Sequence, residues 1–155
     1  MGAAVPACLL GKTARMQGIG EKLRTLDPLP KLPILLVNPN LKIETEMVFE
    51  GFGGEYSPPI NSKKLERPWS ERQLKNLFQS KPQNDLYEAA ASLVPEISEI
   101  LTKLSAIQGV TSTGMSGSGT TCFAIFHPKQ KVKINEAMER LRETNWWYRL
   151  TYLKP

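Results

Sequence analysis

The chain has 155 residues, of which 41% are hydrophobic and 23% are charged, and its formal net charge is +5. These proportions are ordinary for a globular protein, so they argue against a disordered chain or a fibrous repeat. No apolar run approaches the roughly 20 residues of a membrane-spanning helix, and the length fits one domain with one core. The first ten residues lack a basic leading segment and contain Pro6, so we expect no secretory signal.

The charged residues, the cysteines and the single histidine indicate no special chemistry. Carboxylates lie between many of the lysines and arginines, so a solvated surface is favoured over an acidic partner. An RNA-binding domain, whose affinity would fall steeply with salt, is the least favoured interpretation, because aromatic residues do not interleave with the basic ones. Cys8 and Cys122 lie beside apolar residues, which predicts buried free thiols in a reducing cytoplasm rather than a disulfide. His127 belongs to no cluster with metal-ligand spacing, so no metal site is expected.

The first half of the chain predicts short elements separated by turns. Residues 13–17 alternate polar and apolar side chains between two glycines, which predicts a short strand. Closely spaced prolines then predict an extended connector, and the apolar run 34–37 predicts a buried strand. A short helix is expected to begin at Thr45, and the glycine-, proline- and serine-rich stretch 53–70 predicts a long loop.

The second half predicts longer helices and three strands. Residues 70–78 place apolar side chains on one helical face, and a second amphipathic helix begins at Asn84 or Asp85. Pro95 should kink or divide this second helix. The remaining predicted elements are strands at 111–115 and 121–127, a helix at 131–143 and a last strand at 146–153. This order predicts an α+β fold, a ferredoxin-like split βαβ sandwich with helices on one face of an antiparallel sheet.

The segment at 114–126 reads GMSGSGTTCFAIF and joins two predicted strands through a glycine-rich turn. Glycine loses more backbone freedom on folding than any other residue, so Gly114, Gly117 and Gly119 suggest positive φ angles or a close approach to a ligand or another loop. The segment lacks the Gly-Lys-Ser/Thr ending of a P-loop and does not open a helix as a dinucleotide fingerprint does. Taken alone, the turn is therefore as consistent with a structural role as with binding.

Four segments, taken together, resemble one kinase family. They read TARMQGIGE at 13–21, LPILLVNPNLKIETEMVF at 32–49, NDLYEAAASLVPEISEIL at 84–101 and MSGSGTTCFAIF at 115–126. In this order they resemble the C-terminal half of the GHMP kinase superfamily. The GIGE, VNP and ND motifs resemble, within it, the 4-diphosphocytidyl-2-C-methyl-D-erythritol kinase family. The resemblance implies a GHMP kinase C-terminal domain at 12–155, preceded by a junction segment at 1–11 from an N-terminal domain that is missing here.

The resemblance also implies a substrate and the residues that contact it. Such kinases use ATP and magnesium to phosphorylate 4-diphosphocytidyl-2-C-methyl-D-erythritol in the non-mevalonate route to isoprenoids. Thr45 would contact this substrate, and Phe49 would stack on its cytosine ring. From the residues alone, the favoured alternative is that Phe49 is a core residue of a short helix and Thr45 only its N-cap. The resemblance implies a phosphate-side glycine loop made of Gly117, Ser118, Gly119 and Thr120.

Two departures from the family predict that these 155 residues are inactive on their own. Ala4 occupies the position of the aspartate that the family uses as a general base, and losing such a base typically costs about 10² to 10⁴-fold in rate. The lysine and glycine-rich loop with which the family's N-terminal domain holds magnesium and the triphosphate do not occur here. We therefore expect no catalytic residue and no tightly bound ATP. The alternative is a non-catalytic metabolite-binding or protein-interaction module derived from a GHMP kinase.

Overall fold

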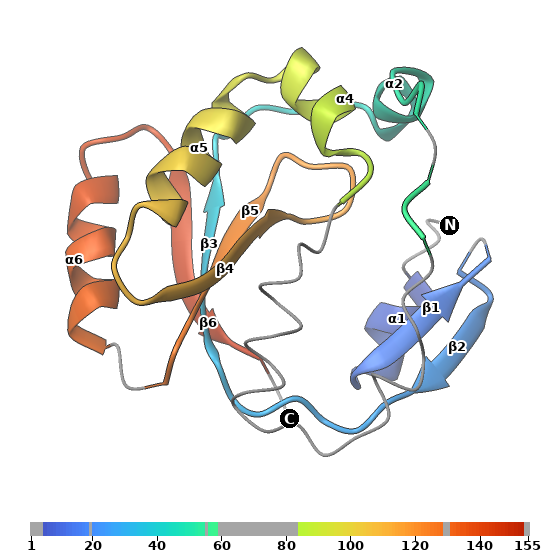
Figure 1. Ribbon diagram of the computed structural model, residues 1–155, viewed down its shortest axis with the longest axis horizontal. Coiled ribbons are helices and arrows are strands. Elements are labelled where there is room, and N and C mark those ends of the chain that lie inside the picture. The colour runs from blue at the N-terminus through green and yellow to red at the C-terminus, as the bar shows by residue number, and fades with distance from the viewer. Residues whose placement is uncertain (1–4, 19, 55, 59–83, 129–130, 154–155) are drawn as a thin grey trace.

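The computed structural model describes residues 5–18, 20–54, 56–58, 84–128 and 131–153. Figure 1 shows a four-stranded sheet with helices packed on one face, and a separate two-stranded hairpin near the N-terminus. Ala4 and the helix predicted at 70–78 lie outside the described residues. Within the described part of the chain, every helix is too short or too polar to cross a membrane.

The four-stranded sheet has the strand order β4-β5-β3-β6, and all of its neighbouring strands are antiparallel. Its strands are β3 (Pro33–Asn38), β4 (Val110–Met115), β5 (Cys122–Phe126) and β6 (Trp147–Tyr152). The helices between them are α2 (Thr45–Glu50), α4 (Tyr87–Leu93), α5 (Glu96–Ser105) and α6 (Lys131–Leu141). With β3 and β5 in the centre, this is the ferredoxin-like split βαβ arrangement, so the predicted fold class is confirmed.

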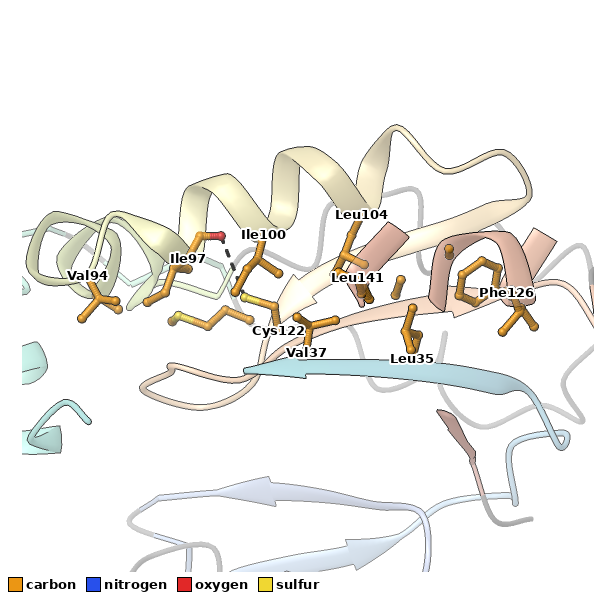
Figure 2. Close-up of a cluster of buried hydrophobic side chains, with 14 of the residues drawn as sticks. Leu35, Val37, Val94, Ile97, Ile100, Leu104, Cys122, Phe126 and Leu141 are labelled. Carbon is orange, nitrogen blue, oxygen red and sulfur yellow. Dashed lines mark hydrogen bonds between the residues drawn. The ribbon is translucent and has the colours of Figure 1, made fainter. Parts of the chain in front are cut away.

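The core lies between the sheet and the helices. In β3 the side chains alternate, and those of Leu35 and Val37 point inward and are fully buried. Facing them, α5 presents buried side chains spaced three and four residues apart, namely Ile97, Ile100 and Leu104. Figure 2 shows these side chains facing one another, with Cys122 of β5 between the two layers.

Pro95 divides the long predicted helix, as expected. Helix α4 ends at Leu93 and α5 begins at Glu96, with Pro95 in the N-cap position of α5. A proline there breaks no helical hydrogen bond, because its missing N–H would precede the first turn. The predicted start at Asn84 or Asp85 is early, since α4 begins at Tyr87.

The N-terminal part contains two elements that sequence reasoning missed. Helix α1 (Val5–Leu10) has no buried residue. The predicted strand at 13–17 is half of a hairpin, because β1 (Ala14–Gln17) pairs with β2 (Lys22–Thr25) in antiparallel register. The sequence of β2 has a single apolar residue, Leu23, which is too little for an alternating pattern to be recognised.

The two cysteines differ in their surroundings. Both are free, as predicted, and Cys122 is buried. Cys8 is exposed, so the predicted burial is wrong for this residue. It lies in α1 next to Leu9, which is itself 83% exposed, so apolar neighbours in the sequence did not indicate a core position.

Candidate functional site

The turn between β4 and β5 requires glycine at two positions. Gly117 has a φ of 58° and Gly119 a φ of 95°, values that L side chains rarely adopt, and the Gly119–Thr120 peptide bond is cis. The Ser116 N–H donates to the Thr121 carbonyl at 2.8 Å and closes the turn. A Cβ at Gly117 would meet nothing within 4 Å, whereas a Cβ at Gly119 would lie 3.1 Å from the Met115 sulfur.

Glycine is required at position 114 for a different reason. It lies opposite Phe123 in the pairing of β4 with β5. A Cβ there would lie 2.7 Å from Cζ of the Phe123 ring, which leaves no room for a side chain. This glycine therefore serves the packing of the sheet, whereas the two in the turn serve its backbone conformation.

Helix α2 brings one of the predicted substrate residues into contact with the turn. The hydroxyls of Thr45 and Ser118 are hydrogen-bonded at 3.0 Å, although they are 73 residues apart in the sequence. Thr45 and Phe49 are four residues apart and therefore share one face of α2. Phe49 is 50% exposed, so its ring is accessible on the helix that contacts the turn.

The two purely structural interpretations of α2 are wrong. The N-cap position is occupied by Glu44, which makes no side-chain cap bond, and Thr45 is the first residue of the helix. The core residue of α2 is Val48, which is fully buried, and not its half-exposed neighbour Phe49. Thr45 is therefore not the helix cap, and Phe49 is not the core residue, that the sequence alone favoured.

Two asparagines hold the turn in place, and sequence reasoning missed this role. The side-chain amide of Asn84 donates to the carbonyl oxygens of Met115 at 3.0 Å and Gly117 at 2.7 Å. On the other side, the Asn38 amide donates to the Thr121 hydroxyl at 2.9 Å. The asparagines of the ND and VNP motifs were the available signal, since an amide next to a turn can satisfy several backbone groups at once.

Thr120, which was predicted to lie on the phosphate side, is only 4% exposed. Its hydroxyl donates to the Leu41 carbonyl at 2.8 Å and so ties the turn to the loop between β3 and α2. Because its hydroxyl is hydrogen-bonded within the protein, the buried side chain of Thr120 stabilises the turn. Ser118 is less buried, and its hydroxyl pairs with that of Thr45.

Cys122 follows the turn at the start of β5 and is chemically inert. The residue is fully buried, and its thiol lies 3.9 Å from the Ile97 carbonyl oxygen (Figure 2). Burial raises the pKa of the Cys122 thiol to about 12, because the apolar surroundings disfavour the thiolate. A thiol that stays protonated at neutral pH is a poor nucleophile. Within the described ranges, no three His, Cys, Asp or Glu side chains lie together as a metal site would need.

The fold just described matches that of known kinases. Residues 71–145 match the family model described as GHMP kinases C terminal. A 4-diphosphocytidyl-2-C-methyl-D-erythritol kinase of Rhodospirillum rubrum is 39% identical over 151 residues, which are 95% of this chain and 47% of that relative. A kinase of the same name from a Chelativorans species is 39% identical over 97% of this chain and 50% of its own length.

Two solved structures have the same fold. A crystal structure of 4-(cytidine 5'-diphospho)-2C-methyl-D-erythritol kinase matches with a TM-score of 0.68 and 27% identity, covering 99% of this chain and 55% of that chain. A homoserine kinase from Cytophaga hutchinsonii matches with a TM-score of 0.67 over 97% of this chain and 50% of its own. At 16% identity, this second likeness concerns the fold alone.

Residues 71–145 match the GHMP kinase C-terminal model, and the chain has the fold of a GHMP kinase C-terminal domain. Within the superfamily, it is similar to the C-terminal half of the 4-diphosphocytidyl-2-C-methyl-D-erythritol kinases. The chain spans about half the length of the curated relatives it matches. The resemblance noted in the sequence is therefore confirmed.

Proposed function

We propose that the chain is the substrate-binding C-terminal part of an ATP-dependent kinase that phosphorylates 4-diphosphocytidyl-2-C-methyl-D-erythritol. The hydrogen bond between Thr45 and Ser118 is the observation that carries this proposal. It joins a helix that carries an exposed aromatic ring to a glycine-rich turn. A nucleoside diphosphate has a base that can stack on the ring and anionic oxygens that can accept hydrogen bonds from the amides of the turn. The names of the relatives support this class of substrate.

Each part of the proposed site has its own role. The Phe49 ring stacks on the cytosine, an interaction worth about 1 to 3 kcal/mol per base in comparable sites. The Thr45 hydroxyl donates to or accepts from a polar group of the substrate. The turn presents the backbone amides of Gly117 and Ser118 to the phosphates, and the missing side chain at Gly117 allows close approach.

In this proposal, phosphoryl transfer needs groups that the described residues do not supply. It depends on positioning the γ-phosphate and neutralising its charge, and on a base for the attacking hydroxyl. An alanine stands at position 4, and the described residues contain no cluster of carboxylates that fits magnesium. In this proposal ATP and magnesium are held by a separate segment, and the chain alone neither binds ATP tightly nor turns over. The two free thiols support a reducing, cytoplasmic location.

A second candidate function is a non-catalytic module that binds the same kind of metabolite or contacts another protein. Ala4, at the position of the family's base, favours this candidate. The module and the kinase part share the cytidine site, so binding alone does not separate them. Turnover does, once the groups that the chain lacks are supplied.

Calorimetric titration of cytidine diphosphate tests the proposed site. We expect Phe49→Ala to weaken binding about 5- to 150-fold, the equivalent of 1 to 3 kcal/mol of stacking. Met47→Ala is the matched control, because Met47 and Phe49 are 49% and 50% exposed on the same helix. The proposal fails if the wild type gives no binding heat, or if both variants bind as the wild type does.

Complementation separates the two candidates. The N-terminal half of the Rhodospirillum rubrum kinase is co-expressed with this chain carrying Ala4→Asp, and phosphorylation of the substrate is measured. Turnover that depends on the restored aspartate supports the kinase. Intact cytidine diphosphate binding without turnover in the co-purified pair supports the non-catalytic module.

A further inference from the structure

We propose that Asn84 and Asn38 are positioning residues that fix the serine-glycine turn in its binding conformation. Their side chains hold the turn from two sides, and the bond from Asn84 to the Gly117 carbonyl directs the next amide, that of Ser118, away from Asn84. Loss of Asn84 therefore weakens binding of a diphosphate more than binding of the nucleoside alone. The choice of a diphosphate as the ligand rests on the proposed function, whereas the positioning role rests on the hydrogen bonds of the two asparagines to the turn.

Both N–H hydrogens and the Oδ1 atom of the Asn84 side chain form hydrogen bonds. A side-chain amide has two N–H hydrogens, and here they go to the carbonyls of Met115, the last residue of β4, and Gly117, in the turn. The Oδ1 atom accepts the Leu86 N–H at 3.1 Å, just before α4 begins. Asn84 therefore joins the start of a packed helix to the turn through three bonds from one side chain.

Asn38 acts on the opposite side of the turn. It is the last residue of β3, a central strand of the sheet, and its amide donates to the Thr121 hydroxyl. Its Oδ1 atom accepts the Asn40 N–H at 2.7 Å, which fixes the orientation of the side chain. The turn is thus held from the helix layer by one asparagine and from the sheet by the other.

The geometry of a peptide bond links these contacts to ligand binding. In a trans peptide the C=O and N–H groups point in opposite directions. With the Gly117 carbonyl bound to Asn84, the Ser118 N–H of the same peptide must point away from Asn84. Within the described residues, this N–H and that of Gly117 donate to no other group, so both are available to an anion.

Two variants of Asn84 test the inference on the whole chain. Asn84→Asp keeps the shape and the acceptor for Leu86 but loses both donors, and Asn84→Ala loses the donors without adding a charge. Gln108→Glu is the matched control, because it makes the same amide-to-carboxylate change at an exposed position. Gln108 lies two residues before β4 begins, at the end of the strand away from the turn. Backbone order parameters from NMR relaxation are measured without ligand.

We expect the order parameters of residues 116–121 to fall from about 0.85, typical of rigid backbone, to below about 0.6 in both Asn84 variants. They stay unchanged in Gln108→Glu. A turn that remains as rigid as in the wild type overturns the inference. Unfolding of the whole domain by both variants also overturns it, because Asn84 would then be a general stability residue.

The affinities for cytidine diphosphate and for cytidine provide the second readout. In Asn84→Ala we expect about a tenfold loss for the diphosphate and less than a twofold loss for the nucleoside. Equal losses for both ligands contradict the positioning role. If the wild type binds neither ligand, the proposed function fails, and the order parameters alone decide the role of Asn84.

Discussion

Replacing Gly119 by alanine should cost clearly more stability than the same replacement at Gly117. Both positions have positive φ, which costs an alanine about 1 to 2 kcal/mol. Alanine also restricts the unfolded chain, which offsets about 0.4 to 1 kcal/mol at either position. The open space around Gly117 adds nothing further, so we expect Gly117→Ala to cost about 1.6 kcal/mol or less.

The surroundings of Gly119 add a second cost. A Cβ there would lie 3.1 Å from the Met115 sulfur and 3.4 Å from the Ile97 Cδ1 atom. Both side chains are buried, so neither moves aside freely, and overpacking of this kind costs about 1 to 3 kcal/mol. The net destabilisation by Gly119→Ala is therefore about 1 to 4.6 kcal/mol. Urea unfolding followed by circular dichroism measures both variants, and equal costs, or a larger cost at Gly117, would refute the reasoning.

Two further predictions concern the stability contributed by Cys122, just after the turn, and by Thr120, within it. Because the pKa of the Cys122 thiol is raised to about 12 from 9.0, the unfolded chain binds fewer protons above pH 9, and stability falls as the pH rises from 9 towards 12. Relative to Cys122→Ala, we expect the wild type to lose about 2 kcal/mol between pH 8 and 10.5 in urea titrations, and a constant difference would contradict this. Thr120→Val removes the donor to the Leu41 carbonyl at nearly constant volume, and urea unfolding should record a loss of about 1 to 3 kcal/mol.

Sequence patterns predicted the sheet and the helices that cover it, because their signals are local and repeated. The alternation in β3 and the three- and four-residue spacing in α5 are patterns that a buried strand and an amphipathic helix must have. Pro95 gave the break between α4 and α5 for an equally local reason. The hairpin partner of β1 was missed because β2 has four residues and little apolar surface.

The candidate site was only partly predictable, because its contacts join segments far apart in the chain. The resemblance pointed to Thr45 and to the serine-glycine turn, but the sequence does not show that the Thr45 and Ser118 hydroxyls meet. The burial of Thr120 and the role of Asn84 depend on how the loops pack against the turn. Neither periodicity nor residue type carries that information.

Mapping of cytidine diphosphate on the amide NMR spectrum of this chain tests the central claim most directly. The claim is that the exposed face of α2 and the turn between β4 and β5 form one nucleotide-binding surface. We predict chemical-shift changes concentrated at residues 45–49 and 117–120 that saturate with a single dissociation constant. Changes gathered instead at the groove of about 280 Å³ between α5 and α6, lined by Leu104, Ile107 and Arg140, would contradict the claim, as would no changes at all.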